Sequence, residues 1–288
     1  MEKIAVLGGT GMAGHVISQY LLEKGFSVTS ISRSNHPMVP SILCDAENYS
    51  KLYEVIVAEK FTLIINCIGI LNDDAKMNKS KSILINSFLP NYLSEKLINT
   101  NIRIIHLSTD CVFSGENGPY LESAIPNGTT FYDRTKIIGE LINHKDITFR
   151  NSLIGPDLKK QGIGLFNWFM NQCSEIYGYK RVLWNGVTTI TLAKAIEYYI
   201  SRPVVGLYHL VSDPVSKYTI LEIFRNSFAK KNNILASNEP VSNKCLINTR
   251  VDFEFIIPTH VEMINEMKKW IYAHKEFYPH YFYIGGEK

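Results

Sequence analysis

Three glycines follow the first apolar run of the chain and restrict what its N-terminal half can fold into. Residues 1–14 read MEKIAVLGGTGMAG, with Gly8, Gly11 and Gly14 at intervals of three. A strand that leads through a glycine turn into a helix directs backbone N–H groups and a helix N-terminus at one place, which suits a pyrophosphate. The spacing therefore predicts a dinucleotide-binding fold.

Short β-branched runs alternate with helix-like stretches over the first half of the chain. IAVLG, FSVTSIS, FTLIINCIG and IRIIHLSTD are separated by the stretches 16–23, 49–59 and 83–97. This order predicts an α/β protein with a doubly wound parallel sheet and ligands at the carboxyl ends of the strands. We expect a Rossmann domain over residues 1–149, with return segments near 182–211, and a smaller α/β substrate-binding domain over 150–288.

Composition argues against several other classes of protein. The 288 residues are 45% hydrophobic and 20% charged, which suits a chain that buries a sizeable core. No stretch is apolar enough to span a bilayer and no basic leader precedes the first strand, so we expect a cytoplasmic protein without a membrane partner. A net charge of +3 with scattered lysines predicts no nucleic-acid partner. Five widely spaced cysteines predict free thiols and no metal site.

The end of the second apolar run indicates which nicotinamide cofactor to expect. An acidic residue there would favour the adenosine ribose diol, but the sequence reads Ile31-Ser32-Arg33-Ser34. Arg33 can pair with a 2′-phosphate and Ser32 can donate a hydrogen bond, which favours NADP(H); the alternative is a solvated loop arginine. We also assign Asp45 and its neighbour Ala46 to the cofactor site, where Asp45 can accept from the adenine amino group or simply form a turn.

Tyr132 and Lys136 are four residues apart in FYDRTKIIGE, so on a helix they share one face. Bringing a phenol from its pKa near 10 to about 7 takes roughly 4 kcal/mol, much of which an adjacent ammonium can supply. We expect Lys136 to lower the Tyr132 pKa and to hold the nicotinamide ribose. Tyr132 would then act as general acid while Thr109 of LSTD hydrogen-bonds the carbonyl oxygen. An exposed Tyr/Lys pair without function is the alternative, against which the glycine turn and LSTD argue.

Four segments carry a family resemblance: GGTGMAG, LSTDCVFSG, GPYLESAIPN and FYDRTKIIGE. They closely resemble the extended short-chain dehydrogenase/reductases, in particular the dTDP-4-dehydrorhamnose reductase-like branch. The resemblance implies a catalytic triad of Thr109, Tyr132 and Lys136, and NADPH-dependent reduction of a 4-keto-6-deoxy sugar on a nucleoside diphosphate, in a pathway to a surface polysaccharide. It also implies cofactor contacts by Gly8, Thr10, Gly11 and Met12 at the pyrophosphate and by Cys67, Ile68 and Gly69.

Two relatives of that branch differ from this chain near the threonine. In sugar-nucleotide 4,6-dehydratases Asp-Glu follows the threonine, whereas here Thr109-Asp110 is followed by Cys111, so the base for elimination is missing. Cys111 matches the cysteine of GDP-fucose synthase-like epimerase-reductases, but no histidine occurs between His144 and His209 to work with it. We therefore expect a small buried thiol. A 4-epimerase that retains its cofactor and a non-catalytic NADP-binding regulatory subunit stay open as alternatives.

The substrate side departs from the rhamnose enzymes, which carry a tryptophan after Arg-Thr-Ser. Here the stretch reads Arg150-Asn151-Ser152-Leu153, so we expect Asn151 to hydrogen-bond a sugar substituent such as an N-acetyl group. Cations for the diphosphate are expected from the second domain, with solvated surface positions as the alternative. The candidates are Lys180, Arg181, Lys217 and Arg250. A UDP- or dTDP-linked sugar and the oligomeric state stay open, with a homodimer as one option.

Overall fold

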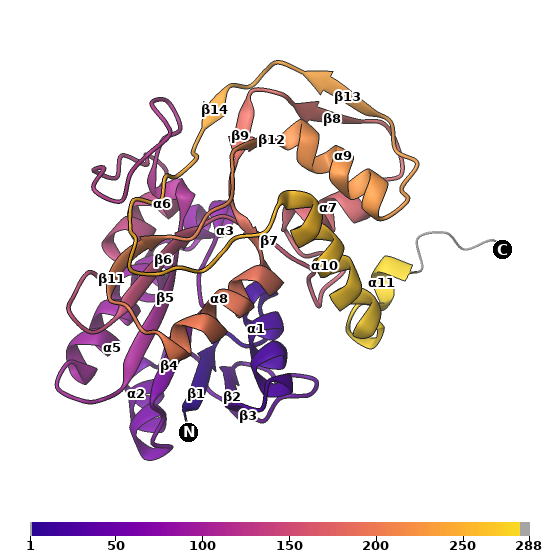
Figure 1. The fold of residues 1–288 in the computed structure, drawn as a ribbon. Coiled ribbons are helices and arrows are strands. Elements are labelled where there is room, and N and C mark those ends of the chain that lie inside the picture. Colours follow the sequence, from indigo (N-terminus) through magenta and orange to yellow (C-terminus); the bar gives the residue numbers. More distant parts are fainter. Residues whose placement is uncertain (1, 283–288) are drawn as a thin grey trace.

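A seven-stranded parallel sheet forms the centre of the computed structural model, which describes residues 2–282 (Figure 1). Its strands are β1 (Lys3–Leu7), β2 (Ser27–Ser32), β3 (Ser41–Leu43), β4 (Leu63–Asn66), β5 (Arg103–Thr109), β6 (Ile147–Asn151) and β11 (Gly206–His209). The strand order is β11-β6-β5-β4-β1-β2-β3, and every pair is parallel. The prediction of a doubly wound α/β sheet is confirmed, with the order reversing between β1 and β4.

Different helices cover the two faces of this sheet. They are α1 (Met12–Glu23) and α8 (Thr189–Ser201) on one face, and α2 (Tyr49–Ala58) and α5 (Leu89–Leu97) on the other. Strand β4 shows the cause, because Leu63 and Ile65 join the core under α1 and α8 while Ile64 joins the core under α2 and α5. Alternate side chains point to opposite faces, so a strand covered on both sides must be apolar throughout.

The connection from β4 to α5 is more elaborate than the single helix expected over residues 83–97. It contains α3 (Asn72–Met77), α4 (Lys79–Ser82) and a π-helical segment, η1 (Ile83–Phe88), before α5 begins. Asn86 within η1 both accepts from the N–H of Ile70 and donates to its carbonyl, each at 2.8 Å, and it donates to Thr135 Oγ1 at 3.1 Å. These bonds tie the π-helical turn to the segment that follows β4, and π-helical turns often mark functional sites.

A smaller lobe lies beyond the carboxyl ends of the main strands, at the top of Figure 1. It is built from short strands and two helices: β7 (Leu153–Ile154), α7 (Leu165–Met170), β8 (Ile176–Tyr179), β9 (Val182–Trp184), β10 (Val187–Thr188), β12 (Val215–Ser216), α9 (Lys217–Ser227), β13 (Ile234–Ser237) and β14 (Ser242–Asn243). Between these elements the chain returns to the main sheet as α8 and β11. The assignment of the smaller lobe to substrate binding stays a prediction.

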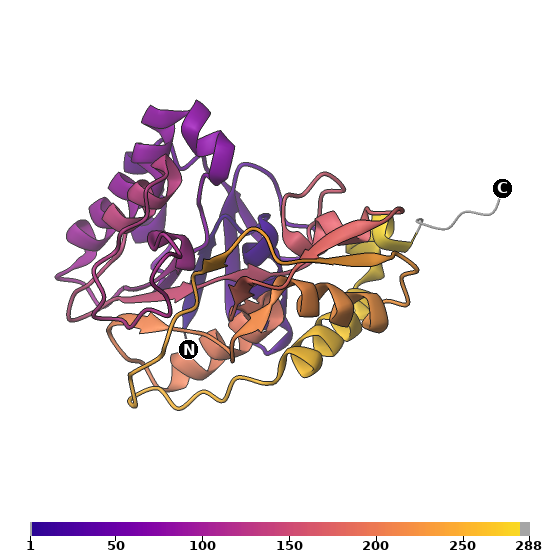
Figure 2. The same ribbon diagram turned by 90° about the horizontal axis from the view of Figure 1, so that it is seen from above.

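The chain from β14 to α10 (His260–Ala273) runs back past the edge of the main sheet (Figure 2). Arg250 fixes this segment, because its Nη1 donates to the carbonyls of Val205 and Leu207 at 2.6 and 3.0 Å beside β11. The chain then continues through η3 (Lys275–Phe277) and α11 (Pro279–Phe282). The C-terminal helices end beside α1 and the loop that follows β7, where the Tyr278 hydroxyl contacts His15 and the Tyr281 hydroxyl accepts from the Asp157 N–H.

The five cysteines are free, as predicted. Within residues 2–282, none of the helices combines the length and the apolar character that crossing a bilayer requires. The same residues contain no cluster of His, Cys, Asp and Glu side chains placed to bind a metal ion.

Candidate active site

The turn between β1 and α1 depends on glycine at two positions. Gly8 has a φ of +75°, a conformation that other residues rarely adopt. A Cβ at Gly14 would lie 2.2 Å from the Gly8 carbonyl oxygen, so α1 approaches the turn too closely for any side chain. No side chain caps α1, whose N-cap is Gly11. Its first N–H groups are left for a ligand, which gives the electrostatics of an anion site.

The C-terminal segment supports this turn through hydrogen bonds to a histidine on α1. Buried His15 lies on α1, with Nδ1 2.8 Å from the Gly11 carbonyl oxygen and Nε2 2.8 Å from the Tyr278 hydroxyl. Because a carbonyl can only accept, Nδ1 carries the proton and Nε2 accepts from Tyr278, whose oxygen also accepts from Trp270 Nε1 at 3.1 Å. Burial lowers the pKa of His15 to about 4, so the ring is neutral at pH 7. No chemical role for His15 follows from the sequence; in the structure it supports the turn.

A cavity of about 350 Å³ opens in front of the turn. Its lining includes the residues predicted for the adenosine and pyrophosphate parts of the cofactor: Gly8, Thr10, Gly11, Ser32, Arg33, Asp45, Ala46, Cys67, Ile68 and Gly69. Ser32 Oγ donates to the Ser34 carbonyl at 2.7 Å, which shapes the loop that carries Arg33. The structure thus brings the predicted cofactor residues together from the ends of β1, β2, β3 and β4.

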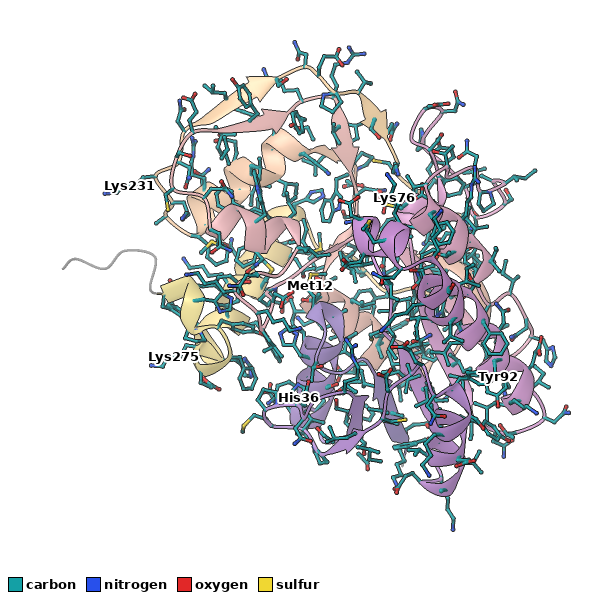
Figure 3. The ribbon with its side chains drawn as sticks, turned by 180° about the vertical axis from the view of Figure 1, so that it is seen from behind. Met12, His36, Lys76, Tyr92, Lys231 and Lys275 are labelled. Atoms are coloured by element: carbon teal, nitrogen blue, oxygen red, sulfur yellow. The ribbon has the colours of Figure 1, made fainter. Side chains whose placement is uncertain are left out.

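A second cavity of about 410 Å³ continues from the first. The two share Gly11, Cys67, Ile68 and Gly69, and Met12 lines the second. Figure 3 labels Met12 at the start of α1, between the main sheet and the smaller lobe. The second cavity reaches Thr109, Tyr132 and Lys136. We call the two cavities together the cofactor groove; it connects the glycine turn with the predicted catalytic residues.

Helix α6 (Phe131–Ile138) presents Tyr132 and Lys136 on one face, as the spacing predicts. A capping box fixes the start of this helix: Thr130 Oγ1 accepts from the Asp133 N–H at 3.1 Å, and the Asp133 carboxylate accepts from the Thr130 N–H at 3.0 Å. Both Tyr132 and Lys136 are buried. Thr109 ends β5 and lines the cavity; its hydroxyl accepts from the N–H of Cys111 and donates to Asp110 Oδ1, both at 3.1 Å.

Lys136 is held by the end of β5. Its Nζ donates to the Leu107 carbonyl at 2.8 Å and lies 3.4 Å from His106 Nε2, and His106 Nδ1 in turn lies 3.1 Å from Asn66 Nδ2. Burial lowers the pKa of Lys136 to about 8, against the opposing charge of Glu140. His106 and Asn66 are supporting residues that sequence reasoning missed, because only the pairing of β4 with β5 brings them under α6.

The pKa of Tyr132 is shifted in the direction opposite to the one expected from the sequence. Burial raises its pKa above the ordinary value for a phenol, while hydrogen bonding with Thr109 acts in the opposite direction. The expected fall toward neutrality is absent because burial dominates and the Lys136 ammonium is directed at the Leu107 carbonyl. Tyr132 is therefore a protonated phenol at pH 7, the form that a general acid requires. Burial also raises the pKa of Cys111 to about 12, so this partly buried residue is a neutral thiol.

Asn151 lies beside Thr109 because β5 and β6 pair these two residues in register. Its side chain is buried and lines the catalytic end of the groove, yet Nδ2 has no hydrogen-bond partner among the described residues. A buried donor without a partner costs about 1–3 kcal/mol, which a ligand oxygen would recover. Asn151 thus lies at the catalytic end of the groove, and its contact with the sugar stays a prediction.

The four cations predicted for a diphosphate do not gather at the groove. Lys180 lies over the Tyr218 ring at 5.7 Å from its centre, and Arg181 pairs with exposed Glu239 at 3.8 Å. Arg250 pairs with Asp252 and the carbonyls beside β11. Lys217 differs from these three. Burial raises the pKa of Asp110, next to Thr109, and the positive charge of Lys217 acts against that rise. Of the four, Lys217 alone acts on the catalytic end, where Lys244 accompanies it.

Sequence reasoning missed a loop that lines both cavities. Lys159 lines the adenosine end, and Asp157, Ile163 and Gly164 line the catalytic end. The pattern of Gly155-Pro156, Gly162 and Gly164 indicates a break in regular structure but not a ligand contact. The tertiary fold places this loop, which connects β7 with α7, against the start of α1.

Comparisons with known proteins agree with this architecture. Residues 1–153 match the family model described as RmlD substrate binding domain. The chain is 30% identical over 139 residues to the probable low-salt glycan biosynthesis reductase of Haloferax volcanii (47% of this chain, 46% of that protein) and 28% identical over 159 residues to dTDP-4-dehydrorhamnose reductase of Aggregatibacter actinomycetemcomitans (53% and 51%). The chain thus spans about half the length of the curated relatives it matches.

A solved structure with the same architecture is dTDP-4-dehydrorhamnose reductase from Bacillus anthracis in complex with NADP. The TM-score is 0.79 at 18% identity, over 94% of this chain and 99% of that one. At this identity the likeness establishes the fold, and it confirms the Rossmann-type arrangement of sheet and helices.

Proposed function

This chain belongs to the RmlD substrate binding domain family, and on that premise we propose that it reduces the 4-keto group of a nucleoside-diphosphate-linked 4-keto-6-deoxyhexose with NADPH. The membership confirms the resemblance to dTDP-4-dehydrorhamnose reductase-like proteins. One observation carries the proposal: Thr109, Tyr132 and Lys136 meet in a cavity that is continuous with the glycine turn. The product would enter deoxysugar and polysaccharide biosynthesis.

The cofactor groove fits NADPH at both ends. The uncapped N-terminus of α1 suits the pyrophosphate, and Arg33 and Ser32 stand where an acidic residue would favour NADH. Lys136 at the other end would hold the nicotinamide ribose. When bound, NADPH supplies the hydride that carbon 4 of the sugar accepts.

The residues of the chain supply the proton and stabilise charge on oxygen. Tyr132 donates its hydroxyl proton to the ketone oxygen as carbon 4 is reduced, so one hydride and one proton convert the carbonyl to a secondary alcohol. Thr109, whose hydroxyl donates to Asp110 Oδ1 in the structure, would redirect that hydrogen bond to the same oxygen, and the Lys136 ammonium, now directed at the Leu107 carbonyl, would turn toward the phenolate that Tyr132 leaves. Solvent then restores the Tyr132 proton.

We assign Asn151 to recognition of the sugar. Its unpartnered Nδ2 can donate to a hydroxyl or to the carbonyl of a 2-acetamido group, beside the oxygen that Thr109 contacts. NADPH oxidation should therefore be measured with a panel of 4-keto sugar nucleotides that differ in base, UDP or dTDP, and in the substituent on carbon 2. An overwhelming preference for dTDP-4-dehydrorhamnose would exclude the acetamido assignment.

The same panel separates the two alternatives. A 4-epimerase would copurify with NAD and interconvert epimers without net NADPH consumption. A non-catalytic regulatory subunit would bind NADPH and leave every sugar unchanged. The presence of Thr109, Tyr132 and Lys136 in one cavity argues against the regulatory subunit, and net NADPH consumption decides between the reductase and the epimerase.

We expect kcat/KM for NADPH to fall as pH rises through about 8. Burial lowers the pKa of Lys136 to about 8, so in the free protein its ammonium loses a proton in this range. The raised pKa of Tyr132 keeps the phenol protonated there. A profile between roughly pH 6 and pH 10 tests this, with Lys136→Arg as the variant that keeps its charge. A descending limb at the same pH in both proteins would contradict the assignment to Lys136.

A further inference from the structure

The loop over residues 155–164 is the part of the groove that comes from the smaller lobe. Lys159 lines the adenosine end, whereas Asp157, Ile163 and Gly164 line the catalytic end. A Cβ on Gly164 would lie 3.0 Å from Met12 Sδ, at the first residue of α1. The loop therefore packs against the start of the helix whose N–H groups face the groove.

Positive charge at the adenosine end comes from two directions. Arg33 follows β2 of the main sheet, and Lys159 lies on the 155–164 loop. Neither has a carboxylate within 4.0 Å among residues 2–282, whereas Lys81, a third cation in the lining, pairs with Glu47. Two unpaired cations and an uncapped helix N-terminus around one cavity favour a phosphate group.

The loop contains no helix or strand, and hydrogen bonds from buried side chains hold it in place. The Tyr281 hydroxyl accepts from the Asp157 N–H and donates to Asn167 Oδ1, both at 2.9 Å. Asn167 Nδ2 then donates to the carbonyls of Lys160 at 3.0 Å and Gly162 at 2.6 Å. Tyr281 and Asn167 are 7% and 1% exposed. These bonds fix the backbone on both sides of Lys159, and without them the loop would gain conformational freedom.

We propose that Lys159 binds a phosphate of the dinucleotide and that Tyr281 is the positioning residue that holds Lys159 at the groove. The proposal rests on the NADPH-binding part of the proposed function and adds a ligand contact from the second lobe. The 2′-phosphate and the pyrophosphate offer the same chemistry to an ammonium, and comparison of NADPH with NADH separates them.

The first test compares Lys159→Ala with Lys160→Ala, by fluorescence titration with NADPH and with NADH in the absence of sugar. Lys160 is a matched control, because it carries the same charge on the same loop but does not line the cavity. A lost charge-assisted hydrogen bond predicts a Kd for NADPH that rises about 10-fold or more in Lys159→Ala and less than about twofold in Lys160→Ala. A rise for NADPH alone identifies the 2′-phosphate, and a rise for both nucleotides identifies the pyrophosphate. Equal effects of the two substitutions would overturn the proposal.

The second test is a double-mutant cycle of Tyr281→Phe with Lys159→Ala. Tyr281→Phe keeps the ring and removes the hydroxyl, so we expect a raised Kd for NADPH when Lys159 is present and little further change when it is absent. Tyr272→Phe, on the exposed face of α10, is the control and should leave Kd unchanged. If Tyr281→Phe raises the Kd for NADPH by the same factor with and without Lys159, the substitution causes a general loss of structure and the positioning role is refuted.

These titrations also separate this proposal from the proposed function. Wild-type protein that binds NADPH but reduces no sugar refutes the reductase, and the Lys159 comparison still decides the phosphate contact. Wild-type protein that binds neither nucleotide overturns both.

Discussion

Tyr132→Phe is expected to lower kcat for sugar reduction by about 10²–10⁴-fold while the Kd for NADPH changes little. The substitution removes one hydroxyl from a buried ring at the catalytic end of the groove and leaves the glycine turn and Arg33 intact. Without that hydroxyl the ketone oxygen loses the proton donor that the mechanism assigns to it, although Thr109 can still donate a hydrogen bond. The rate is followed by NADPH absorbance, and binding by nucleotide fluorescence.

Tyr177→Phe provides a matched control, because Tyr177 is an exposed tyrosine on β8 outside both cavities. It should leave rate and binding unchanged. If Tyr132→Phe keeps the wild-type rate, another group supplies the proton and the mechanism is wrong. Loss of NADPH binding together with the rate would instead assign Tyr132 a role in shaping the groove.

Arg150→Met is expected to lower the free energy of unfolding by about 3–5 kcal/mol. Arg150 donates to both carboxylate oxygens of Glu140, from Nε at 2.7 Å and from Nη2 at 2.6 Å, and both side chains are almost wholly buried. Methionine fills similar space but leaves the Glu140 carboxylate without a cation, with Ser108 still donating at 2.6 Å. The stacking of Arg150 over Phe113, at 5.2 Å from the ring centre, is lost as well.

Urea unfolding measures this change, with Arg181→Met as the control. Arg181 pairs with Glu239 where both side chains are mostly exposed, so its removal should cost less than about 1 kcal/mol. Combining Arg150→Met with Glu140→Gln should recover part of the loss, because the second change removes the unpaired charge. A loss in Arg150→Met no larger than in Arg181→Met would show that the buried pair adds little to stability.

Much of the main sheet could be predicted from the sequence because its signals are local. The helix-like stretch 16–23 lies within α1, Met12–Glu23, and the stretch 49–59 is observed as α2, Tyr49–Ala58. The four-residue spacing of Tyr132 and Lys136 places both on one face of α6. In each case a residue pattern within one or a few turns decides the outcome.

The parts that could not be predicted depend on contacts between distant segments. His15 meets Tyr278 across 263 positions of sequence, and Tyr281 reaches Asp157 across 124. The Tyr132 pKa depends on burial, which a spacing of residues cannot reveal. Charge alone makes Arg250 a candidate for the diphosphate, whereas in the structure it binds backbone carbonyls at the edge of the sheet. Such roles become visible only after the smaller lobe and the C-terminal helices are packed.

Transfer of deuterium from NADPH that carries deuterium at both positions of nicotinamide carbon 4 tests the central claim most directly. The 4-keto sugar nucleotide that the panel selects is incubated with labelled NADPH, and the product is examined by NMR. We predict one deuterium on carbon 4 of the sugar for each NADPH consumed. In Tyr132→Phe we expect this transfer of deuterium to be lost. An epimerised sugar without deuterium, or NADPH that binds and is never oxidised, would contradict the reductase.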